Sequence, residues 1–311
     1  MNFIDLHCDT ASKIYYDELN IESDVCKVNI HKLKEGNALA QVFAFFIDQS
    51  ITKTPYEEFL KVYNNFNLQI NKHSSEIKIV KNLKELESCK KNGKVGAFLS
   101  IEEGEVIEGE VEKLRNVYQM GIRILTITWN YKNKLGYPNA GFKYQNNGLT
   151  EKGIEILEEV ETLGIIPDAS HLSDGGFYNL AKLCKKPFIA SHSNARAITN
   201  HPRNLTDEMI RKLSNNGGVM GINFCSEFLG KEKISSLEDI LVHIKHIKNV
   251  GGIDVISLGS DFDGIDNEVE IRDCSKFNKL YVALKENGFN ESEIEKIFYK
   301  NTMRVFNEVL K

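Results

Sequence analysis

The sequence predicts an α/β protein in which eight parallel strands alternate with helices and close into a (β/α)8 TIM-type barrel. Short, almost continuous apolar runs are typical of strands that are buried on both faces, as the strands of a parallel sheet are. Longer amphipathic stretches, typical of surface helices, separate these runs along the chain. An open, doubly wound sheet would show the same alternation, so it is the structural alternative.

Each expected strand is an apolar run of four to seven residues that is rich in Val, Ile and Phe. The runs are Phe3–Leu6, Ala40–Phe46, Val95–Leu99, Ile122–Thr128, Gly164–Pro167, Pro187–Ala190, Val219–Asn223 and Val255–Gly259. Helices are expected between them, and several begin at residues that commonly cap a helix N-terminus. These expected caps, with the capping-box partner where one is present, are Thr150, Thr206, Ser235 with Glu238, and Asn290 with Glu293.

The composition is that of an ordinary globular protein, with 41% hydrophobic and 27% charged residues. The formal net charge of -5 gives no electrostatic reason to expect binding to nucleic acid or to an anionic membrane. The N-terminus lacks the apolar stretch of a signal peptide and no window resembles a membrane helix, so we expect a cytoplasmic location. The six cysteines form no CxxC pair and are expected to be reduced. No linker divides the chain, and we expect one barrel domain over residues 1–311.

Polar side chains follow six of the eight expected strands, at the point where each strand ends. In a parallel barrel the carboxyl ends of all strands open onto one face, and that face carries the active site. We therefore expect these side chains to meet on one rim. The segments are His7–Asp9, Ile101–Gly104, Thr128–Asn130, Asp168–His171, Ser191–Ser193 and Ser260–Gly264.

Imidazole and carboxylate groups together suit Zn²⁺ or a similar divalent ion. His7 and Asp9 point the same way in an extended segment because side chains alternate, so both can bind one ion. His171 and His192 end neighbouring strands of the expected barrel and can bind a second ion, with a glutamate bridging the two. The segment 101–104 holds two adjacent glutamates, and alternation allows only one of them to face inward.

Each of these signals has a simpler interpretation when it stands alone. A single histidine at a strand end is more often a hydrogen-bonded core or rim residue than a ligand, and Asp261 alone could be a helix cap. Several ligand types in register on one rim are harder to explain in this way. The other histidines lack that setting: His243 and His246 are expected on a solvated helix face, and His201 lies near Arg203 on the loop after the sixth expected strand.

Taken together, the motifs resemble those of one family, the renal or membrane dipeptidases (peptidase family M19). The members of this family are metal-dependent hydrolases with an amidohydrolase-type barrel. The resemblance covers nearly the whole chain, and the motifs occur in the family's order. They are Asp5–Thr10, Ile101–Gly104, Leu125–Asn130, Asp168–His171, Ser191–Ser193, Asn223–Phe224, Gly259–Gly264 and Asn301–Phe306.

The resemblance implies a set of metal ligands for two zinc ions. Glu102 matches the family's bridging glutamate by its position, and Glu103 then replaces a usual glycine. Glu102 would contribute to both ions, and each ion would take two further ligands. The implied ligands are His7, Asp9, Glu102, His171 and His192.

The resemblance also implies residues that act on the substrate. Asp261 would relay a proton from water to the leaving amine, and Arg203 would pair with the substrate's C-terminal carboxylate. Mammalian members carry a histidine that helps to hold the substrate carbonyl oxygen, and here that position is Trp129. Trp129 and Asn130 are therefore the expected substrate contacts at this position, although the family's pattern does not carry over there.

The implied function is that of a zinc-dependent dipeptidase, in which water activated by two metal ions hydrolyses the peptide bond of a dipeptide. The expected partner is a small dipeptide, and homodimers are common among relatives. Another amidohydrolase on the same barrel, such as a lactonase, deacetylase or deaminase, is the nearest alternative. A metal-stabilised binding protein without turnover is the alternative of another class. A panel of dipeptides, lactones and N-acyl amino acids separates these hypotheses.

Overall fold

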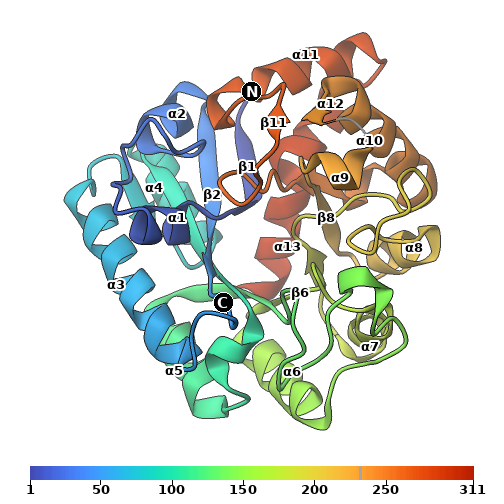
Figure 1. Ribbon diagram of the computed structural model, residues 1–311. Helices are drawn as coiled ribbons and strands as arrows, with labels where there is room; N and C mark the ends of the chain where they lie inside the picture. The colour runs from blue at the N-terminus through green and yellow to red at the C-terminus, as the bar shows by residue number, and fades with distance from the viewer. Residues whose placement is uncertain (231–232) are drawn as a thin grey trace.

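The computed structural model describes residues 1–230 and 233–311, and a closed barrel of eight parallel strands lies at its centre (Figure 1). The barrel strands pair in the order β2, β1, β10, β8, β7, β6, β5 and β4, and β2 also pairs with β4, so the sheet closes on itself. Each barrel strand overlaps one predicted apolar run, and the closed barrel is confirmed over the open sheet. The barrel strands are β1 (Phe3–Cys8), β2 (Ala38–Phe46), β4 (Val95–Glu102), β5 (Ile122–Thr126), β6 (Ile166–Asp168), β7 (Ile189–Ala190), β8 (Val219–Ile222) and β10 (Ile256–Leu258).

Within the described residues, three short strands lie outside the barrel, and the apolar runs do not predict them. β3 (Ile77–Ile79) pairs in parallel with the first residues of β4. β9 (Ile234–Ser235) and β11 (Glu268–Val269) pair with each other and connect the segments that follow β8 and β10. Strands of two or three residues are too short for a periodic pattern to identify them.

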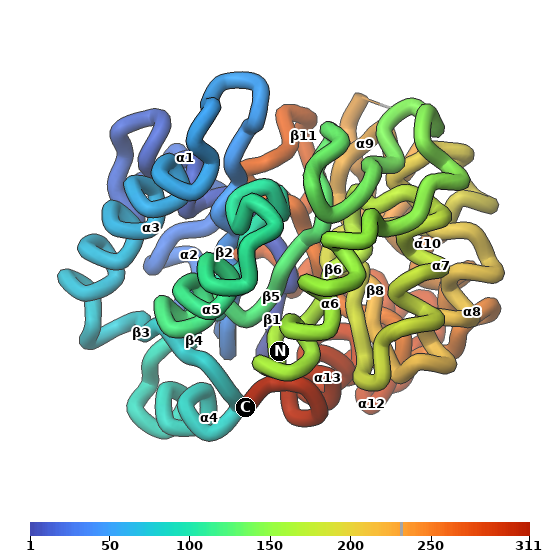
Figure 2. Tube along the Cα trace, turned by 90° about the horizontal axis from the view of Figure 1, so that it is seen from below, coloured from blue at the N-terminus to red at the C-terminus, as the bar shows by residue number. Residues whose placement is uncertain are grey.

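Helices surround the barrel, with α3 and α4 on one side and α7, α8 and α10 on the other (Figure 2). The predicted caps Thr150, Thr206 and Asn290 are confirmed, because each side chain accepts a hydrogen bond from the backbone N–H three residues later. The helices are α1 (Thr10–Tyr16), α2 (Ile30–Glu35), α3 (Pro55–Lys72), α4 (Leu83–Lys91), α5 (Val111–Met120), α6 (Glu151–Leu163), α7 (Asp174–Leu183), α8 (Asp207–Asn215), α9 (Ser226–Leu229), α10 (Leu237–Gly251), α11 (Asn278–Glu286), α12 (Glu291–Glu295) and α13 (Asn301–Val309).

The predicted capping box at the start of α10 is wrong by one residue. Ser236 caps this helix, and Asp239 completes the box by accepting from the Ser236 backbone N–H. Ser235 is the last residue of β9, and its hydroxyl donates to the backbone oxygen of Phe224 at 2.6 Å. The unexpected strand therefore takes the residue that the sequence pattern placed at the cap.

The interior of the barrel is filled by apolar side chains from its strands. α13 closes the end near the strand N-termini, because Val305, Phe306 and Val309 pack into the same cluster. The ring of Phe306 lies 4.6 Å from the ring of Phe98, measured between centroids. Strand residues of this cluster include Ile4, Leu6, Val42, Phe98, Ile124, Ile166, Ile189 and Val219.

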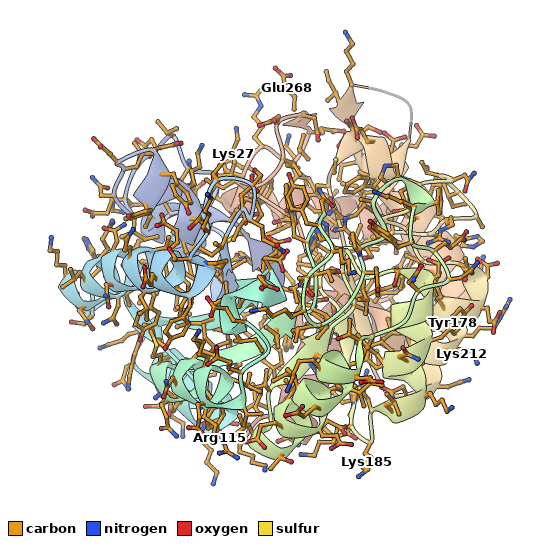
Figure 3. All side chains as sticks on the ribbon, turned by 60° about the horizontal axis from the view of Figure 1, so that its bottom comes forward. Lys27, Arg115, Tyr178, Lys185, Lys212 and Glu268 are labelled. Atoms are coloured by element: carbon orange, nitrogen blue, oxygen red, sulfur yellow. The ribbon has the colours of Figure 1, made fainter. Side chains whose placement is uncertain are left out.

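Charged side chains cover the outer surface, and Arg115, Lys185 and Lys212 point away from the barrel in Figure 3. Arg115 on α5 forms an ion pair with Glu159 on α6 at 2.8 Å, and exposed pairs of this kind contribute only about 0–1 kcal/mol to stability. All six cysteines, which lie within the described residues, are free thiols and five are buried, as predicted. Among the helices of the described ranges, we find none with both the length and the apolar character needed to cross a bilayer.

Candidate metal centre

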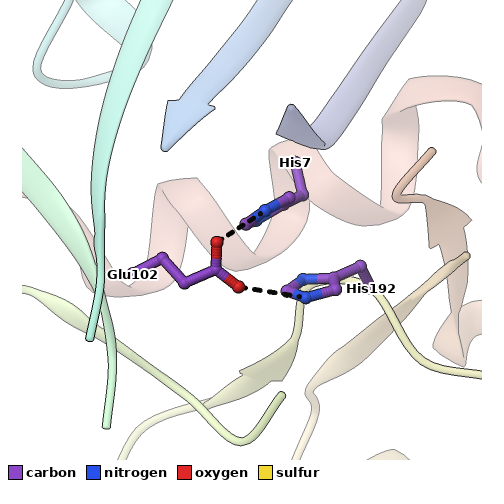
Figure 4. Close-up of side chains that lie close together, drawn as sticks. All are labelled: His7, Glu102 and His192. Atoms are coloured by element: carbon purple, nitrogen blue, oxygen red, sulfur yellow. Dashed lines mark ion pairs between the residues drawn. The ribbon is translucent and has the colours of Figure 1, made fainter. Parts of the chain in front are cut away.

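The carboxylate of Glu102 lies between histidines at the carboxyl end of the barrel (Figure 4). Glu102 ends β4 and faces the barrel axis with Phe98, four residues earlier on the same strand. Its Oε2 lies 3.3 Å from His7 Nε2, whereas its Oε1 lies 3.2 Å from His171 Nε2 and 3.4 Å from His192 Nε2. The two oxygens of one carboxylate thus face two separate sets of imidazoles.

On one side of Glu102, His7 lies between two further carboxylates. His7 Nε2 is 3.4 Å from Asp9 Oδ2 and 3.8 Å from Asp261 Oδ1. His7 and Asp9 come from the end of β1, and Asp261 follows β10. Because β1 and β10 are paired neighbours in the barrel, residues more than 250 positions apart come together here.

On the other side of Glu102, His171 and His192 approach each other. Their Nε2 atoms lie 3.1 Å apart. His171 follows β6 and His192 follows β7, and these two strands are paired. The prediction that these histidines are neighbours despite 21 residues of separation is confirmed.

The spacing of these atoms fits shared cations. Carboxylate oxygens and imidazole nitrogens bind Zn²⁺ at about 2.0–2.2 Å, so two ligands of one tetrahedral ion lie roughly 3.3–3.6 Å apart. The contacts that Glu102 makes with the three histidines are 3.2–3.4 Å long. In addition, His7 Nε2 and Asp9 Oδ1 are buried and make no hydrogen bond to any residue in the described ranges. Buried polar atoms without a partner are costly, and a bound cation would supply the partner.

The ionisation of the cluster also fits a cation. Burial and the nearby Glu102 raise the pKa of Asp9 well above its usual value. Burial alone would lower the pKa of His7, but Glu102 and Asp9 raise it well above normal. Burial lowers the pKa of His171 to about 3 and also lowers the pKa of His192, so both rings are neutral at pH 7. Neutral imidazole, the form that binds a metal ion, is thus favoured at His171 and His192, whereas at His7 a cation would take the place of the ring proton and relieve the crowding of the acids.

The loops hold several of these residues in a strained backbone conformation. Glu103 has a φ of 104°, His171 of 65° and Asp261 of 62°, in a region that L-amino acids rarely adopt. Such strain persists where the surrounding structure enforces it, and it collects at functional sites.

Gly264 leaves the space that two of these carboxylates occupy. A Cβ atom at this position would lie 2.0 Å from Asp9 Oδ2 and 2.8 Å from Asp261 Oδ1. The loop after β10 therefore approaches the acidic side of the site as closely as its backbone allows. Any larger residue at position 264 would displace a proposed ligand.

Two asparagines orient residues of the site through their side chains. Asn130 Oδ1 lies 3.1 Å from His171 Nδ1, and Asn223 Nδ2 donates to Asp261 Oδ2 at 2.8 Å. Asn130 was expected to contact substrate, and in the structure its oxygen faces a histidine. The sequence pattern assigned no role to Asn223, although its position directly after β8 was the signal that could have identified it.

Glu103 points away from the proposed ligands, which confirms that only one of the two adjacent glutamates faces inward. Its carboxylate accepts hydrogen bonds from the backbone N–H of Glu105 at 2.8 Å and of Trp129 at 3.2 Å, and from Asn133 Nδ2 at 2.5 Å. Glu103 thus ties the end of β4 to the loop after β5. The ring of Trp129, which this loop carries, packs against Phe46 at 4.6 Å between centroids.

A cavity of about 770 Å³ opens onto this cluster, which is large enough for a small organic ligand. Apolar walls are provided by Phe46 and Trp129, and by Phe228 and Ile265. The predicted site residues that line the cavity are Asp9, Glu102, Trp129, Asn130, His171 and Asp261.

Arg203 lies beside the cavity but is not among the residues that line it. Its side chain is only 4% exposed, and Nη2 donates to the backbone oxygen of His192 at 3.1 Å. Nε and Nη1 are buried and have no hydrogen-bond partner in the described part of the chain. The guanidinium packs over the ring of Phe228 at 5.3 Å, and Phe228 lines the cavity.

A sequence comparison identifies the family. The sequence model of the membrane dipeptidases, peptidase family M19, matches residues 1–311. This chain belongs to the membrane dipeptidase family. The chain is also 31% identical over 250 residues to an uncharacterized protein encoded in the pqqA 5′ region of Klebsiella pneumoniae, with 78% of this chain and 92% of that protein covered. An uncharacterized dipeptidase of Schizosaccharomyces pombe is 28% identical, with 97% of this chain and 77% of that protein covered.

Solved structures agree with the barrel fold of this membrane dipeptidase. A metallopeptidase from Rhodobacter sphaeroides, liganded with a phosphinate mimic of the dipeptide L-Ala-D-Ala, superposes with a TM-score of 0.91 at 23% identity over 99% of both chains. A probable dipeptidase from Pseudomonas aeruginosa superposes with a TM-score of 0.88 at 17% identity, over 99% of this chain and 95% of that one. Family membership makes this protein a metallo-dipeptidase, so metal dependence and a small peptide substrate are established as predicted.

The remaining histidines of this dipeptidase lie outside the cluster. The prediction that His243 lies on a solvated helix face is wrong, because this ring is buried between the backbone N–H of Ala195 and the backbone oxygen of Leu229. His246 is partly exposed and pairs with Asp207 at 2.7 Å. The ring of His201 packs against Phe228, and does not line the cavity.

Proposed function

We propose that this dipeptidase uses two zinc ions, held on the two sides of Glu102, to hydrolyse the peptide bond of a dipeptide. His7 and Asp9 would hold one ion and His171 and His192 the other, with one Glu102 oxygen for each ion. The observation that carries the proposal is the position of the Glu102 carboxylate, with Oε2 3.3 Å from His7 Nε2 and Oε1 3.2 Å from His171 Nε2. The unpartnered atoms of His7 and Asp9 support the same assignment.

Bound ions of this kind lower the pKa of a water molecule and polarise the substrate carbonyl. Within this chain, Asp261 would move the proton. Asn223 holds its Oδ2 at 2.8 Å, while its Oδ1 faces His7 at 3.8 Å, and the residue lines the cavity. Asp261 would take a proton from the attacking water at its free oxygen and give it to the leaving nitrogen, because a carboxylate within reach of both can act as base and then as acid.

Arg203 would anchor the free carboxylate of the substrate and so favour dipeptides over long chains. Its buried Nε and Nη1 carry N–H groups that make no hydrogen bond to the described residues, and a guanidinium can bind a carboxylate with two parallel hydrogen bonds. Phe228 packs on the guanidinium and lines the cavity, so this ring would move aside when the carboxylate enters.

Trp129 would take the place of the family's histidine near the substrate carbonyl. Its ring lies 6.2 Å from the ring of His171, and an indole N–H can donate to a carbonyl oxygen but cannot accept a proton. Asn130 would orient His171 through the contact with Nδ1 at 3.1 Å, in addition to lining the cavity.

The test of the whole proposal is the hydrolysis of a dipeptide panel by purified protein before and after chelation, with lactones and N-acyl amino acids as competing substrate classes. We expect dipeptides to be cleaved, chelation to abolish cleavage, and Zn²⁺ to restore it as the second equivalent binds. The bound metal is counted by mass spectrometry, and Co²⁺ and Mn²⁺ are compared because nitrogen and oxygen ligands select poorly among these ions. Full activity with one equivalent of metal would overturn the two-ion arrangement.

Asp261→Asn tests the proton transfer separately from metal binding. Loss of a general acid-base group typically costs about 10²–10⁴-fold in rate, and we expect kcat to fall in this range while two equivalents of zinc remain bound. Glu268→Gln, an exposed carboxylate that also follows β10 but does not line the cavity, is the matched control and should change kcat little. Retained kcat in the Asp261 variant would contradict its role.

A further inference from the structure

Asp168 is a buried carboxylate that the proposed mechanism does not use. It ends β6, and its side chain is fully buried. Its Oδ1 accepts the backbone N–H groups of Ser170 at 3.0 Å and Ser191 at 2.8 Å, and its Oδ2 accepts the hydroxyls of Thr126 at 2.7 Å and Ser191 at 2.6 Å. Four donors converge on this side chain, which is the environment of an ionised carboxylate that only accepts.

The hydroxyl of Ser191 connects this carboxylate to His192. Ser191 Oγ lies 2.6 Å from Asp168 Oδ2 and 2.7 Å from His192 Nδ1. A hydroxyl has one proton to donate and two lone pairs with which to accept. Because the carboxylate can only accept, Ser191 gives its proton to Asp168, and its oxygen accepts a proton from His192 Nδ1. The ring proton is then on Nδ1, and the lone pair is on Nε2.

We propose that Asp168 and Ser191 are positioning residues that fix the tautomer of His192, so that its Nε2 lone pair is directed at the metal. The inference rests on the proposed function in one respect, namely that His192 is a metal ligand. Nε2 lies 3.4 Å from Glu102 Oε1, the atom with which it would share an ion. Outer partners of this kind usually contact the imidazole directly, whereas here one serine hydroxyl lies between the carboxylate and the ring.

The barrel contains a matched pair of residues that lacks the imidazole. Asp5 on β1 accepts the backbone N–H of Ser260 at Oδ1 with a distance of 2.8 Å, and the hydroxyl of Ser260 at Oδ2 with a distance of 2.6 Å. These are the two distances found between Asp168 and Ser191, and both aspartates are fully buried. The other contacts of the Ser260 hydroxyl in the described residues are backbone atoms of His7 and Phe262. Asp5→Asn therefore alters the same aspartate–serine contact without acting on an imidazole nitrogen.

Asp168→Asn tests the relay because it reverses one hydrogen bond while keeping the shape of the side chain. The amide oxygen must stay where the two backbone N–H groups converge, which places the amide NH₂ against Ser191 Oγ. We expect the Ser191 proton to turn to His192 Nδ1, 2.7 Å away, rather than to Ser170 Oγ, 3.2 Å away, and the ring proton then moves to Nε2. We expect this variant to bind one zinc ion as the wild type does, and the other roughly 10–100-fold more weakly, in competition with a chromogenic chelator.

Two further measurements separate the relay from a purely structural role. Ser191→Ala should weaken the same ion, and Ser191→Thr, which keeps the hydroxyl, should restore binding. A long-range ¹H–¹⁵N NMR spectrum of metal-free, histidine-labelled protein reports which nitrogen of His192 carries the proton before any ion binds. We expect the proton on Nδ1 in the wild type and in Asp5→Asn. Thermal unfolding should show similar losses of stability in Asp5→Asn and Asp168→Asn.

The outcomes distinguish this inference from the proposed function. Unchanged affinity for both ions in Asp168→Asn, or an equal loss of zinc in Asp5→Asn, overturns the relay alone. Wild-type protein that binds no second zinc ion overturns both the two-ion proposal and the relay. A selective loss of one ion in Asp168→Asn, with the ring proton of His192 moved, supports both.

Discussion

Gly264→Ala adds one methyl group beside the acidic half of the site, and its effect follows from the local geometry. The new Cβ would lie 2.0 Å from Asp9 Oδ2 and 2.8 Å from Asp261 Oδ1. Carbon–oxygen contacts are normally about 3.3 Å or longer, so Asp9 Oδ2 would have to move by about 1.3 Å. The φ of Gly264 lies outside the left-handed region, so the methyl group is the whole perturbation.

Such a displacement is too large for a metal ligand. Distances at a functional metal site hold to within about 0.2 Å, so Asp9 would no longer bind the ion that we propose it shares with His7. We expect the affinity for that ion to fall by at least a factor of about 10–100, which is about 1.4–2.8 kcal/mol. Competition with a chelator measures this change, and circular dichroism checks that the variant is folded.

The matched control is Gly136→Ala, because a Cβ atom at that position meets no atom closer than 3.4 Å. A second control combines Gly264→Ala with Asp9→Ala. Removing the Asp9 side chain removes the principal collision, so the added methyl group should then have little effect on metal affinity. A folded Gly264→Ala protein that binds both ions as tightly as the wild type would refute the assignment of Asp9 as a ligand.

Three other predictions test different parts of the molecule. Phe306→Ala should lower the free energy of unfolding by about 3–5 kcal/mol without changing metal stoichiometry, because the buried ring packs on Phe98 at the closed end of the barrel. Chemical denaturation measures this change, and a loss below about 1 kcal/mol would contradict the packing. Glu103→Gln should raise KM more than it lowers kcat. The glutamine side chain has only one oxygen, so its amide NH₂ would face one of the two donors, Asn133 Nδ2 or the Trp129 backbone N–H, that the carboxylate now accepts. Steady-state kinetics measure both constants, and a fall in kcat alone would count against this prediction. Burial raises the pKa of Cys225 to about 11, so the thiol stays protonated at about pH 8. Alkylation by iodoacetamide should therefore be slow at about pH 8 and accelerate toward about pH 11. Rapid alkylation at about pH 8 would contradict this prediction.

Much of the barrel could be predicted because a strand buried on both faces must be apolar along its whole length. That requirement places Val95–Leu99 and Val219–Asn223 in strands without any knowledge of their neighbours. The closed barrel was predicted from eight strands that alternate with helices, but the open sheet stayed an alternative because this alternation does not show that β1 pairs with β10 across most of the chain. The cap at Ser236 was missed because the short strand β9, which takes Ser235, has no periodic pattern of its own.

The residues of the site were predictable to the extent that barrel topology carries strand ends to one rim. His171 and His192 meet because β6 and β7 are neighbours, and that follows from their order in the chain. The contact of Asn223 with Asp261 depends on side-chain rotamers, which no sequence pattern encodes. His243 was misplaced for a related reason: its helix position allows an exposed face, but the buried donor of Ala195 needs an acceptor there.

The left-handed backbone of Glu103, His171 and Asp261 has a consequence for engineering this enzyme. A non-glycine residue in this conformation costs of order 1–3 kcal/mol, and that cost is removed only by changing residues whose side chains the site requires. Substitutions that make the catalytic rim more stable should therefore lower activity, whereas the opposite end, where α13 packs against the strands, is free of that conflict. Heat-resistant variants that retain turnover are best sought among substitutions that improve packing around Val305 and Val309.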